Sequence, residues 1–289
     1  MSTARLNLFT QHSRAWRANR YVYPVVSRRS KGLSIGVNLN PDTACNFDCI
    51  YCSVDRTVPP SVTEVDLDVL REELAAMIEL AATGRIWREA PFDQTPPHLR
   101  RLNDLAFSGD GEPTSYPKFA DACALAASLL QQAGLSSSIK LVLITNATLF
   151  HHPPVARALE FLDRHNGEIW AKLDAGTEGY YHLVERTKVP LRRVLDNLLQ
   201  AGRVRPIVIQ SLFMRIHGEA PSTREIDAYI ARLRELRDGG CRIKLVQVYT
   251  TARTTAETYV TPLENAALDM ITEKVRDLGL GAETYYGPS

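Results

Sequence analysis

The chain has 289 residues, of which 45% are hydrophobic and 23% are charged, and its formal net charge is +1. This length and apolar content suffice for one large or two ordinary folded domains, and they exclude disorder as the default state. The near-zero net charge excludes a global field that would attract nucleic acid or an anionic membrane, although local patches remain open. Five cysteines, three of them within eight residues, argue against a disulfide scaffold and for a reducing compartment.

Residues 1–31 form a basic N-terminal arm, which we expect to pack on the core. The arm contains no Asp or Glu, and its cationic residues are Arg5, Arg14, Arg17, Arg20, Arg28, Arg29 and Lys31. It is either a solvated arm or an anion-binding surface for a phosphate or a nucleic-acid backbone. The arm lacks the apolar region of a secretory signal, and no apolar run in the chain approaches the roughly 18 residues of a membrane span. We therefore expect a cytoplasmic protein that has no membrane partner.

From residue 32 onward, short apolar segments alternate with longer amphipathic segments in six repeats. The predicted strands are 33–39, 104–107, 140–145, 169–173, 207–214 and 243–249. The predicted helices are 66–82, 118–133, 154–164, one from Pro190 to Gly202, one capped by Ser222 or Thr223, and one opened by Pro262. This alternation predicts an α/β fold in which a mostly parallel sheet is open or curled into a barrel. Residues 32–289 form a single domain in this interpretation, with an irregular insertion at 85–101 that is either a substrate loop or lid or an ordinary surface loop.

Three cysteines lie in one segment, Cys45-Asn46-Phe47-Asp48-Cys49-Ile50-Tyr51-Cys52, directly after the first predicted strand. The segment therefore follows the carboxyl end of a strand, where parallel α/β folds place their active sites. Three thiolates can hold three corners of a 4Fe-4S cluster and leave its fourth iron open for chemistry. The alternative is a structural zinc site, which needs a fourth ligand. Cys123 and Cys241 stand apart in the sequence and offer no second half of such a site.

This segment resembles the signature of the radical SAM superfamily, Cys-x3-Cys-x-aromatic-Cys. The resemblance implies a partial (βα)6 barrel, with one 4Fe-4S cluster on Cys45, Cys49 and Cys52 and with S-adenosyl-L-methionine as the second cofactor. It also implies that Tyr51, at the aromatic position, lies beside the adenine. The chemistry that it implies is reductive cleavage of S-adenosyl-L-methionine to a 5′-deoxyadenosyl radical, which abstracts hydrogen from the substrate.

A second motif, Phe107-Ser108-Gly109-Asp110-Gly111-Glu112-Pro113-Thr114, ends the second predicted strand. Glycines let a backbone approach a ligand closely, and a carboxylate can pair with an ammonium group. Taken alone, such a sequence is an ordinary turn. Its place after the second strand gives it a resemblance to the superfamily's Gly-Gly-Glu motif, which binds the methionine ammonium group. We therefore expect Gly109, Asp110, Gly111 and Glu112 to bind the cofactor, with the role of Asp110 open because the family has glycine there.

Polar residues at the ends of later strands are further candidates for cofactor binding. Superfamily members commonly place ribose and carboxylate contacts at such strand ends. The candidates are Asn146, Lys172, Asp174, Gln210 and Ser211. Inward polar side chains of a barrel need a partner, which a cofactor, a substrate or a neighbouring side chain can supply. Lys172 and Asp174 can equally form a structural ion pair.

Residues 23–29, 36–39 and 246–253 extend the resemblance to a group of iron-sulfur oxidoreductases related to the wyosine-forming tRNA synthases. Those synthases carry extra N-terminal cysteines for a second cluster, whereas no cysteine precedes Cys45 here. We therefore predict a one-cluster radical SAM oxidoreductase that takes electrons from an external donor of the flavodoxin or ferredoxin type. RNA or a nucleotide, bound through the basic arm, is the specific substrate hypothesis. The alternatives are a maturase or activase of a protein or peptide, and a non-catalytic iron-sulfur or zinc binding module.

Overall fold

The computed structural model describes residues 16–287, which form two compact units. The first unit comprises the described chain up to Cys45, Val58–Ile144 and His152–Glu168. The second comprises Asn46–Thr57, Thr145–His151 and the chain from Ile169 onward. Residues 1–15, which include Arg5 and Arg14 of the predicted arm, lie outside the described residues.

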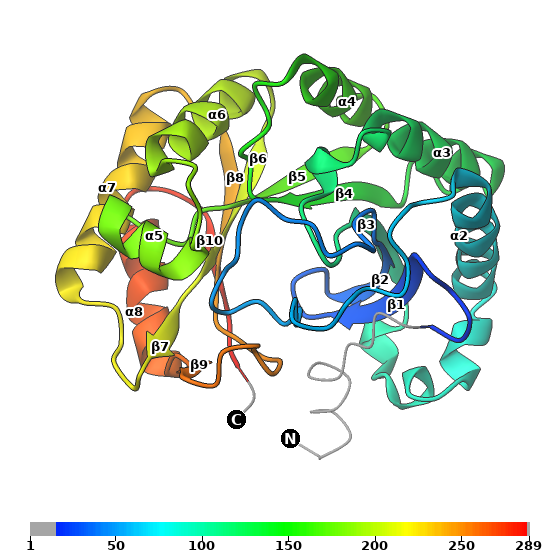
Figure 1. Ribbon diagram of the computed structural model, residues 1–289, viewed down its shortest axis with the longest axis horizontal. Helices are drawn as coiled ribbons and strands as arrows, with labels where there is room; N and C mark the ends of the chain where they lie inside the picture. The colour runs from blue at the N-terminus through cyan, green and yellow to red at the C-terminus, as the bar shows by residue number, and fades with distance from the viewer. Residues whose placement is uncertain (1–15, 288–289) are drawn as a thin grey trace. The chain divides into compact units, whose positions relative to one another are not determined.

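The first unit is a sheet with helices on one face (Figure 1). Its strands, in the hydrogen-bonded order β1-β2-β3-β4, are β1 (Val22–Ser27), β2 (Gly32–Val37), β3 (Leu102–Phe107) and β4 (Lys140–Thr145). Strand β1 is antiparallel to β2, whereas β2, β3 and β4 are parallel. The helices are α2 (Leu67–Ala82), α3 (Phe119–Gln132) and α4 (Pro153–Asp163), with short 3-10 helices at Arg85–Arg88, Phe92–Gln94, Pro97–Leu99 and Pro113–Ser115.

Local sequence signals explain where these helices begin and what they bury. Asp66 is the N-cap of α2, and its side chain accepts hydrogen bonds from two backbone N–H groups of the first turn. Leu70 and Leu74 lie on the buried face of that helix. Phe119 at the start of α3 packs edge-to-face on Phe107 of β3, with 5.7 Å between the ring centroids. Helix and strand are thereby joined by apolar contact.

The insertion at 85–101 contacts the beginning of the described chain. Trp16 packs edge-to-face on Phe92 at 5.5 Å between ring centroids, and the Arg17 guanidinium lies 2.5 Å from a carboxylate oxygen of Glu89. The last residues before β1 are therefore bound to this insertion. Strand β1, which was not predicted, lies within the predicted arm.

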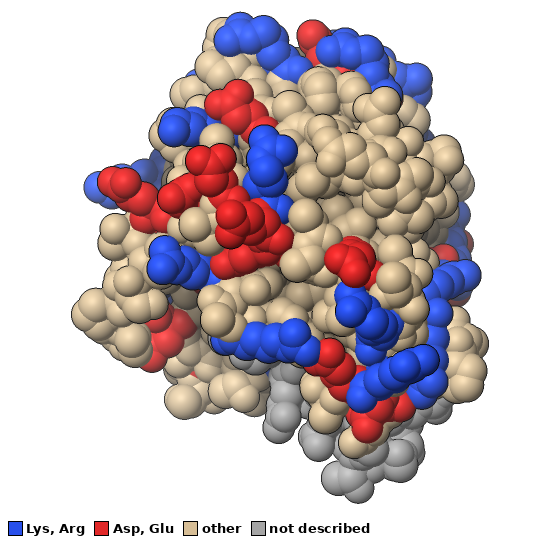
Figure 2. Space-filling view, turned by 90° about the vertical axis from the view of Figure 1, so that its right-hand side faces the viewer, with Lys and Arg blue, Asp and Glu red and all other residues tan. Residues whose placement is uncertain are grey.

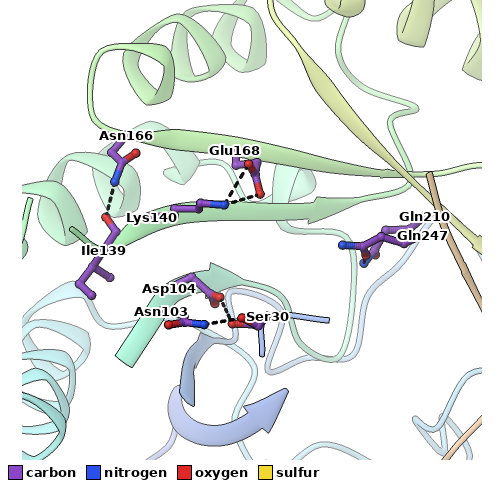
Figure 3. A network of polar contacts seen from close by, with 9 residues as sticks. All are labelled: Ser30, Asn103, Asp104, Ile139, Lys140, Asn166, Glu168, Gln210 and Gln247. Carbon is purple, nitrogen blue, oxygen red and sulfur yellow. Dashed lines mark hydrogen bonds and ion pairs between the residues drawn. The ribbon is translucent and has the colours of Figure 1, made fainter. Parts of the chain in front are cut away.

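A buried polar network lies at the beginning of the first unit's strands (Figure 3). Asp104 of β3 is buried and accepts hydrogen bonds from the hydroxyls of Ser30 and Ser34. Burial raises the pKa of the Asp104 carboxyl, and the two hydroxyls oppose that shift. Beside it, the Lys140 ammonium lies 3.1 Å from both carboxylate oxygens of Glu168. This network was not predicted from the sequence.

The second unit contains the remaining strands and helices. Its main strands, in the hydrogen-bonded order β5-β6-β8-β10, are β5 (Gly167–Lys172, whose first two residues belong to the first unit), β6 (Ile207–Leu212), β8 (Ile243–Tyr249) and β10 (Ala282–Tyr285). A small antiparallel sheet contains β7 (Met214–Ile216) and β9 (Val260–Pro262). The helices are α5 (Glu178–Glu185), α6 (Leu191–Val204), α7 (Thr223–Asp238) and α8 (Asn265–Arg276). The register pairs of β5, β6, β8 and β10 are all parallel.

Two boundaries in this unit differ from prediction. The predicted strand 207–214 is interrupted at Phe213, which donates its N–H to the Tyr249 carbonyl and packs on Tyr229 with 5.1 Å between ring centroids. The chain therefore leaves β6 and starts β7 in the small sheet. The prediction that Pro262 opens a helix was wrong: Pro262 ends β9, and α8 begins at Asn265. Helix α5 and strands β7, β9 and β10 were not predicted.

Charges of both signs alternate on the face of the molecule shown in Figure 2. Surface ion pairs of the first unit, such as Arg85 with Glu79 at 2.7 Å, are typical of such a mixed surface. In residues 16–287, no helix combines the length and apolarity needed to cross a bilayer.

Candidate active site

The five cysteines, all free thiols, differ in their access to solvent. Cys45, Cys49 and Cys52 are partly exposed on the loop that follows β2. Cys123 and Cys241 are buried, and burial raises the pKa of both thiols, that of Cys241 to about 11. The three closely spaced cysteines are therefore the ones available to a metal centre.

The end of helix α5 holds the cysteine loop in the second unit. The Asp48 N–H donates to the Glu185 carbonyl at 3.0 Å, and the Ile50 N–H donates to the Val184 carbonyl at 2.9 Å. These carbonyls lie in the last turn of α5, where a helix leaves its carbonyl groups without intrahelical partners. The hydroxyl of Thr187, just beyond the helix, donates to the Asn46 carbonyl at 2.8 Å. The carbonyl groups at the end of α5 thus fix the backbone around Cys49.

Asn146, one of the predicted site residues, ties the end of β4 to the same loop. Its side-chain amide donates to the Asn46 side chain at 2.7 Å, and its oxygen accepts from the N–H and the hydroxyl of Thr148. Asn46 in turn donates to the Thr148 hydroxyl at 2.6 Å. The three side chains form a closed hydrogen-bonded triangle beside the loop, so Asn146 orients the loop directly.

Glu185 is an additional site residue that was not predicted. This residue is 1% exposed, and its carboxyl group accepts a hydrogen bond from the Cys49 thiol at 2.6 Å. Burial and the nearby Asp174 raise the pKa of the Glu185 carboxyl, and burial likewise raises the pKa of the Cys49 thiol. In the described chain no three His, Cys, Asp or Glu side chains converge as metal ligands. Because the thiolate is the form that binds a metal, Cys49 must give up the proton that it donates to Glu185 before it can be a ligand.

Lys172 and Asp174, predicted as site residues, are joined in one buried group with Tyr51. The Lys172 ammonium lies 2.9 Å from an Asp174 carboxylate oxygen, donates to the Tyr249 hydroxyl at 2.6 Å, and lies over the Tyr51 ring at 4.8 Å. The Tyr51 hydroxyl donates to Asp174 at 2.5 Å. Burial by itself lowers the pKa of Lys172, but Asp174 and Tyr249 outweigh that effect and raise it. Lys172 is therefore a fixed cation.

Gln210 shares a face of the sheet with Lys172. The register pairs Lys172 with Gln210 and Gln210 with Gln247, and residues paired in this way on parallel strands point to the same face. The Gln210 amide donates to the Gln247 oxygen at 2.7 Å (Figure 3), whereas the Gln210 Oε1 has no hydrogen-bond partner among residues 16–287 although the side chain is 0% exposed. Ser211 points to the opposite face, where it accepts from the Tyr229 hydroxyl at 2.7 Å. Ser211 is thus not brought to the Lys172 group.

The predicted glycine turn belongs to the first unit. Gly109, Asp110, Gly111 and Glu112 follow β3 and lie against the chain that follows β2: a Cβ atom at Gly109 would overlap Asn38, and one at Gly111 would overlap the Ala44 carbonyl. Only glycine fits at either position. Glu112 is buried, and its Oε1 accepts from the backbone N–H of Thr114 at 3.1 Å. The turn therefore lies next to the residue that precedes Cys45.

The donor chemistry of the loop fits an iron-sulfur cluster better than zinc. It offers three partly exposed cysteines within eight residues, and thiolates are the ligands that such clusters require. The other two thiols, which zinc could use as a fourth ligand, are buried in α3 and ahead of β8. Asp48, the acidic residue inside the loop, lies 3.6 Å from Arg186 in an ion pair. The types of donor on this loop therefore suit a cluster with three protein ligands.

Comparison with solved structures identifies the fold. A radical SAM methyltransferase from Sphaerobacter thermophilus superposes over 93% of this chain and 70% of its own, with a TM-score of 0.62 at 12% identity. The predicted mostly parallel partial barrel is thereby confirmed. TYW1 with a lysine-pyruvate adduct bound is also similar, over 96% of this chain and 82% of its own, with a TM-score of 0.49 at 15% identity.

Sequence comparison identifies the family. A UPF0026 protein of Helicobacter pylori strain 26695 is 24% identical over 216 residues, or 74% of this chain. A UPF0026 protein of Methanocaldococcus jannaschii is 26% identical over 61% of this chain and 46% of its own. The chain spans 61% of the length of the first of these relatives. Residues 39–225, which contain both predicted motifs, match the model of the radical SAM superfamily, and the chain therefore belongs to that superfamily.

Proposed function

We propose that this chain is a radical SAM enzyme that binds one 4Fe-4S cluster through Cys45, Cys49 and Cys52. The observation that carries the proposal is the contrast between these three partly exposed cysteines, on a loop whose backbone is held by α5, and the buried Cys123 and Cys241. Three protein thiolates leave one iron of a cubane open for a further ligand.

Several side chains carry functional groups that suit S-adenosyl-L-methionine as that ligand. Lys172 is a fixed cation that can pair with a carboxylate, and Glu112 can accept from an ammonium group. The unpaired Gln210 Oε1 can accept a hydrogen bond from a bound ligand, which would remove the cost of burying it alone. When bound, the cluster and S-adenosyl-L-methionine supply one-electron cleavage and a hydrogen-abstracting radical. The protein's part is to hold, orient and shield these reactants.

The experiment that tests this function is anaerobic reconstitution. The wild-type chain should take up about four irons and, with dithionite and S-adenosyl-L-methionine, release 5′-deoxyadenosine. Cys49→Ala should lose most of its iron and all cleavage, whereas Cys241→Ala, the matched control in a buried thiol, should keep both. A fully loaded chain that releases no 5′-deoxyadenosine would overturn the proposal. Calorimetry then measures whether the iron-loaded chain binds S-adenosyl-L-methionine. A non-catalytic module would bind iron but have no affinity for S-adenosyl-L-methionine.

We further propose a cytoplasmic enzyme that takes its electron from a flavodoxin or ferredoxin and acts on RNA or a nucleotide. The free thiols of all five cysteines suit a reducing compartment. The RNA hypothesis rests on the cationic residues of the predicted arm at 1–31. Nucleoside analysis of tRNA from cells that lack the protein tests it. Unchanged modified nucleosides would favour a protein or peptide substrate instead.

A further inference from the structure

Asp110 stands where the superfamily motif has glycine, and its side chain bonds reciprocally with Asn38. The Asn38 amide donates to an Asp110 carboxylate oxygen at 2.5 Å, and the Asp110 backbone N–H donates to the Asn38 oxygen at 3.1 Å. Asn38 follows β2 directly, and Asp110 lies shortly after the end of the neighbouring strand β3. The pair therefore joins the ends of two parallel strands of one unit.

Further contacts extend this junction toward the first cysteine. The Asn38 oxygen also accepts the Asn40 N–H at 3.1 Å, and the Asn40 side chain donates to the Ser115 hydroxyl at 3.1 Å. Gly111 lies so close to the Ala44 carbonyl that no Cβ fits between them. Residues 38–44 and 109–115 thus contact each other along their length, immediately before Cys45. Asn38 is 4% exposed, so water does not compete for its hydrogen bonds.

We propose that Asp110 is a positioning residue: through Asn38 it holds the Gly109–Glu112 turn against the segment that leads into Cys45, and it does not itself bind the methionine ammonium group. The inference rests on the proposed function, in which this turn receives that group. The physical basis of this role is backbone entropy. A turn that contains Gly109 and Gly111 can adopt many conformations, and binding a ligand costs the conformational entropy of all but one of them. A charge-assisted hydrogen bond on the residue between them removes part of that freedom in advance.

Asp110 would need its negative charge as a ligand of the ammonium group, but not as a positioning residue. A ligand of an ammonium group needs the negative charge at position 110. A positioning residue needs only an acceptor that faces Asn38, and the side-chain oxygen that Asp110→Asn introduces can still accept from the Asn38 amide. Exchanging the pair in Asn38→Asp with Asp110→Asn keeps both hydrogen bonds and reverses only the one between the side chains: the carboxylate at 38 still accepts the backbone N–H of residue 110, and the new amide at 110 donates to that carboxylate.

Binding of S-adenosyl-L-methionine to the reconstituted chain tests the proposal. Asp110→Ala should keep its iron but bind about tenfold more weakly or worse. Asp110→Asn and the exchanged pair should stay within about threefold of wild type. Asp121→Ala, which removes an exposed carboxylate of α3 in the same unit, is the control and should not change the affinity. If the exchanged pair binds as weakly as Asp110→Ala, the charge at 110 is required and the proposal is overturned.

Hydrogen exchange of the cluster-free chain gives a readout that does not depend on cofactor binding. The backbone amides of residues 109–112 should exchange faster in Asp110→Ala than in wild type, and the exchanged pair should restore the slower rate. Equal exchange in wild type and Asp110→Ala would overturn the proposal. If wild type shows the protected turn but no affinity for S-adenosyl-L-methionine, the proposed function fails while the positioning role of Asp110 stands.

Discussion

The hydroxyl of Tyr51, which stands between Cys49 and Cys52, donates a hydrogen bond to the Asp174 carboxylate at 2.5 Å. The other oxygen of Asp174 accepts the Leu212 N–H at 2.7 Å. One carboxylate therefore joins the cysteine loop to β6, and it also provides the countercharge of Lys172. This hydrogen bond fixes the position of the Tyr51 hydroxyl, and the expected contact of its ring with an adenine stays a prediction.

Removing this carboxylate should destabilise the fold strongly. Asp174→Ala leaves the Lys172 ammonium buried without its partner, and we expect the free energy of unfolding to fall by about 3–5 kcal/mol. Urea denaturation of the cluster-free chain measures the change. Asp227→Ala breaks an exposed ion pair with Lys274 in the same unit and should cost less than about 1 kcal/mol. Equal effects of the two variants would show that Asp174 is not a buried counterion.

Lys172 should resist acylation. Its pKa is raised by Asp174 and Tyr249 against the opposing effect of burial, and each unit of a raised pKa lowers the fraction of reactive free amine about tenfold. Its side chain is also only 13% exposed. Brief labelling with an acylating reagent, followed by peptide mass spectrometry, should modify Lys172 at least about tenfold more slowly than the exposed Lys188. Comparable rates would contradict a fixed, paired cation at this position.

Asp104 should make the stability of the first unit fall as the pH rises. Because burial raises the pKa of its carboxyl on folding, the folded chain binds more protons than the unfolded chain between the ordinary and the raised value. The stability advantage of wild type over Asp104→Asn should therefore decrease from about pH 4 upward and level off above the raised pKa. Urea denaturation across that range measures it.

Ser34→Ala provides a comparison for the same titration. It removes a hydroxyl that lowers the Asp104 pKa, so the decrease should extend to higher pH in this variant. Lys140 and Glu168 also face this carboxyl, and they lower and raise its pKa respectively, in wild type and in Ser34→Ala alike. An advantage of wild type that grows with pH would show that the folded state favours ionised Asp104.

Two glycine substitutions should change the free energy of unfolding in opposite directions. A Cβ at Gly36 of β2 would overlap the ring of the buried Tyr23, and we expect Gly36→Ala to lower the free energy of unfolding by about 1–3 kcal/mol. Gly179 lies inside α5 with no neighbouring atom within 4 Å of such a Cβ, so Gly179→Ala should stabilise the chain by about 0.5–1 kcal/mol. Thermal and urea denaturation measure both. Destabilisation by Gly179→Ala would mean that α5 needs its flexibility.

Local patterns in the sequence predicted much of the fold. The predicted strand 243–249 coincides with β8, 140–145 coincides with β4, and the predicted helix 66–82 coincides with α2 and its N-cap Asp66. These features depend on neighbours in the sequence, because caps and periodicity act over one helical turn or one strand. Strands β1 and β10 escaped prediction because each lies at the end of its unit's strand order, where pairing with β2 or β8 is decided by the fold.

At the candidate site, too, the sequence determined some features and the tertiary structure decided others. The spacing of Cys45, Cys49 and Cys52 determined by itself that three thiols lie on one loop, since they stand within eight consecutive residues whatever the fold. The partners of that loop were decided only by tertiary structure. Glu185 reaches Cys49 across 136 positions, and Asn38 reaches Asp110 across 72. Such pairs depend on which strand ends and helix ends the fold brings together, and no local propensity encodes that proximity.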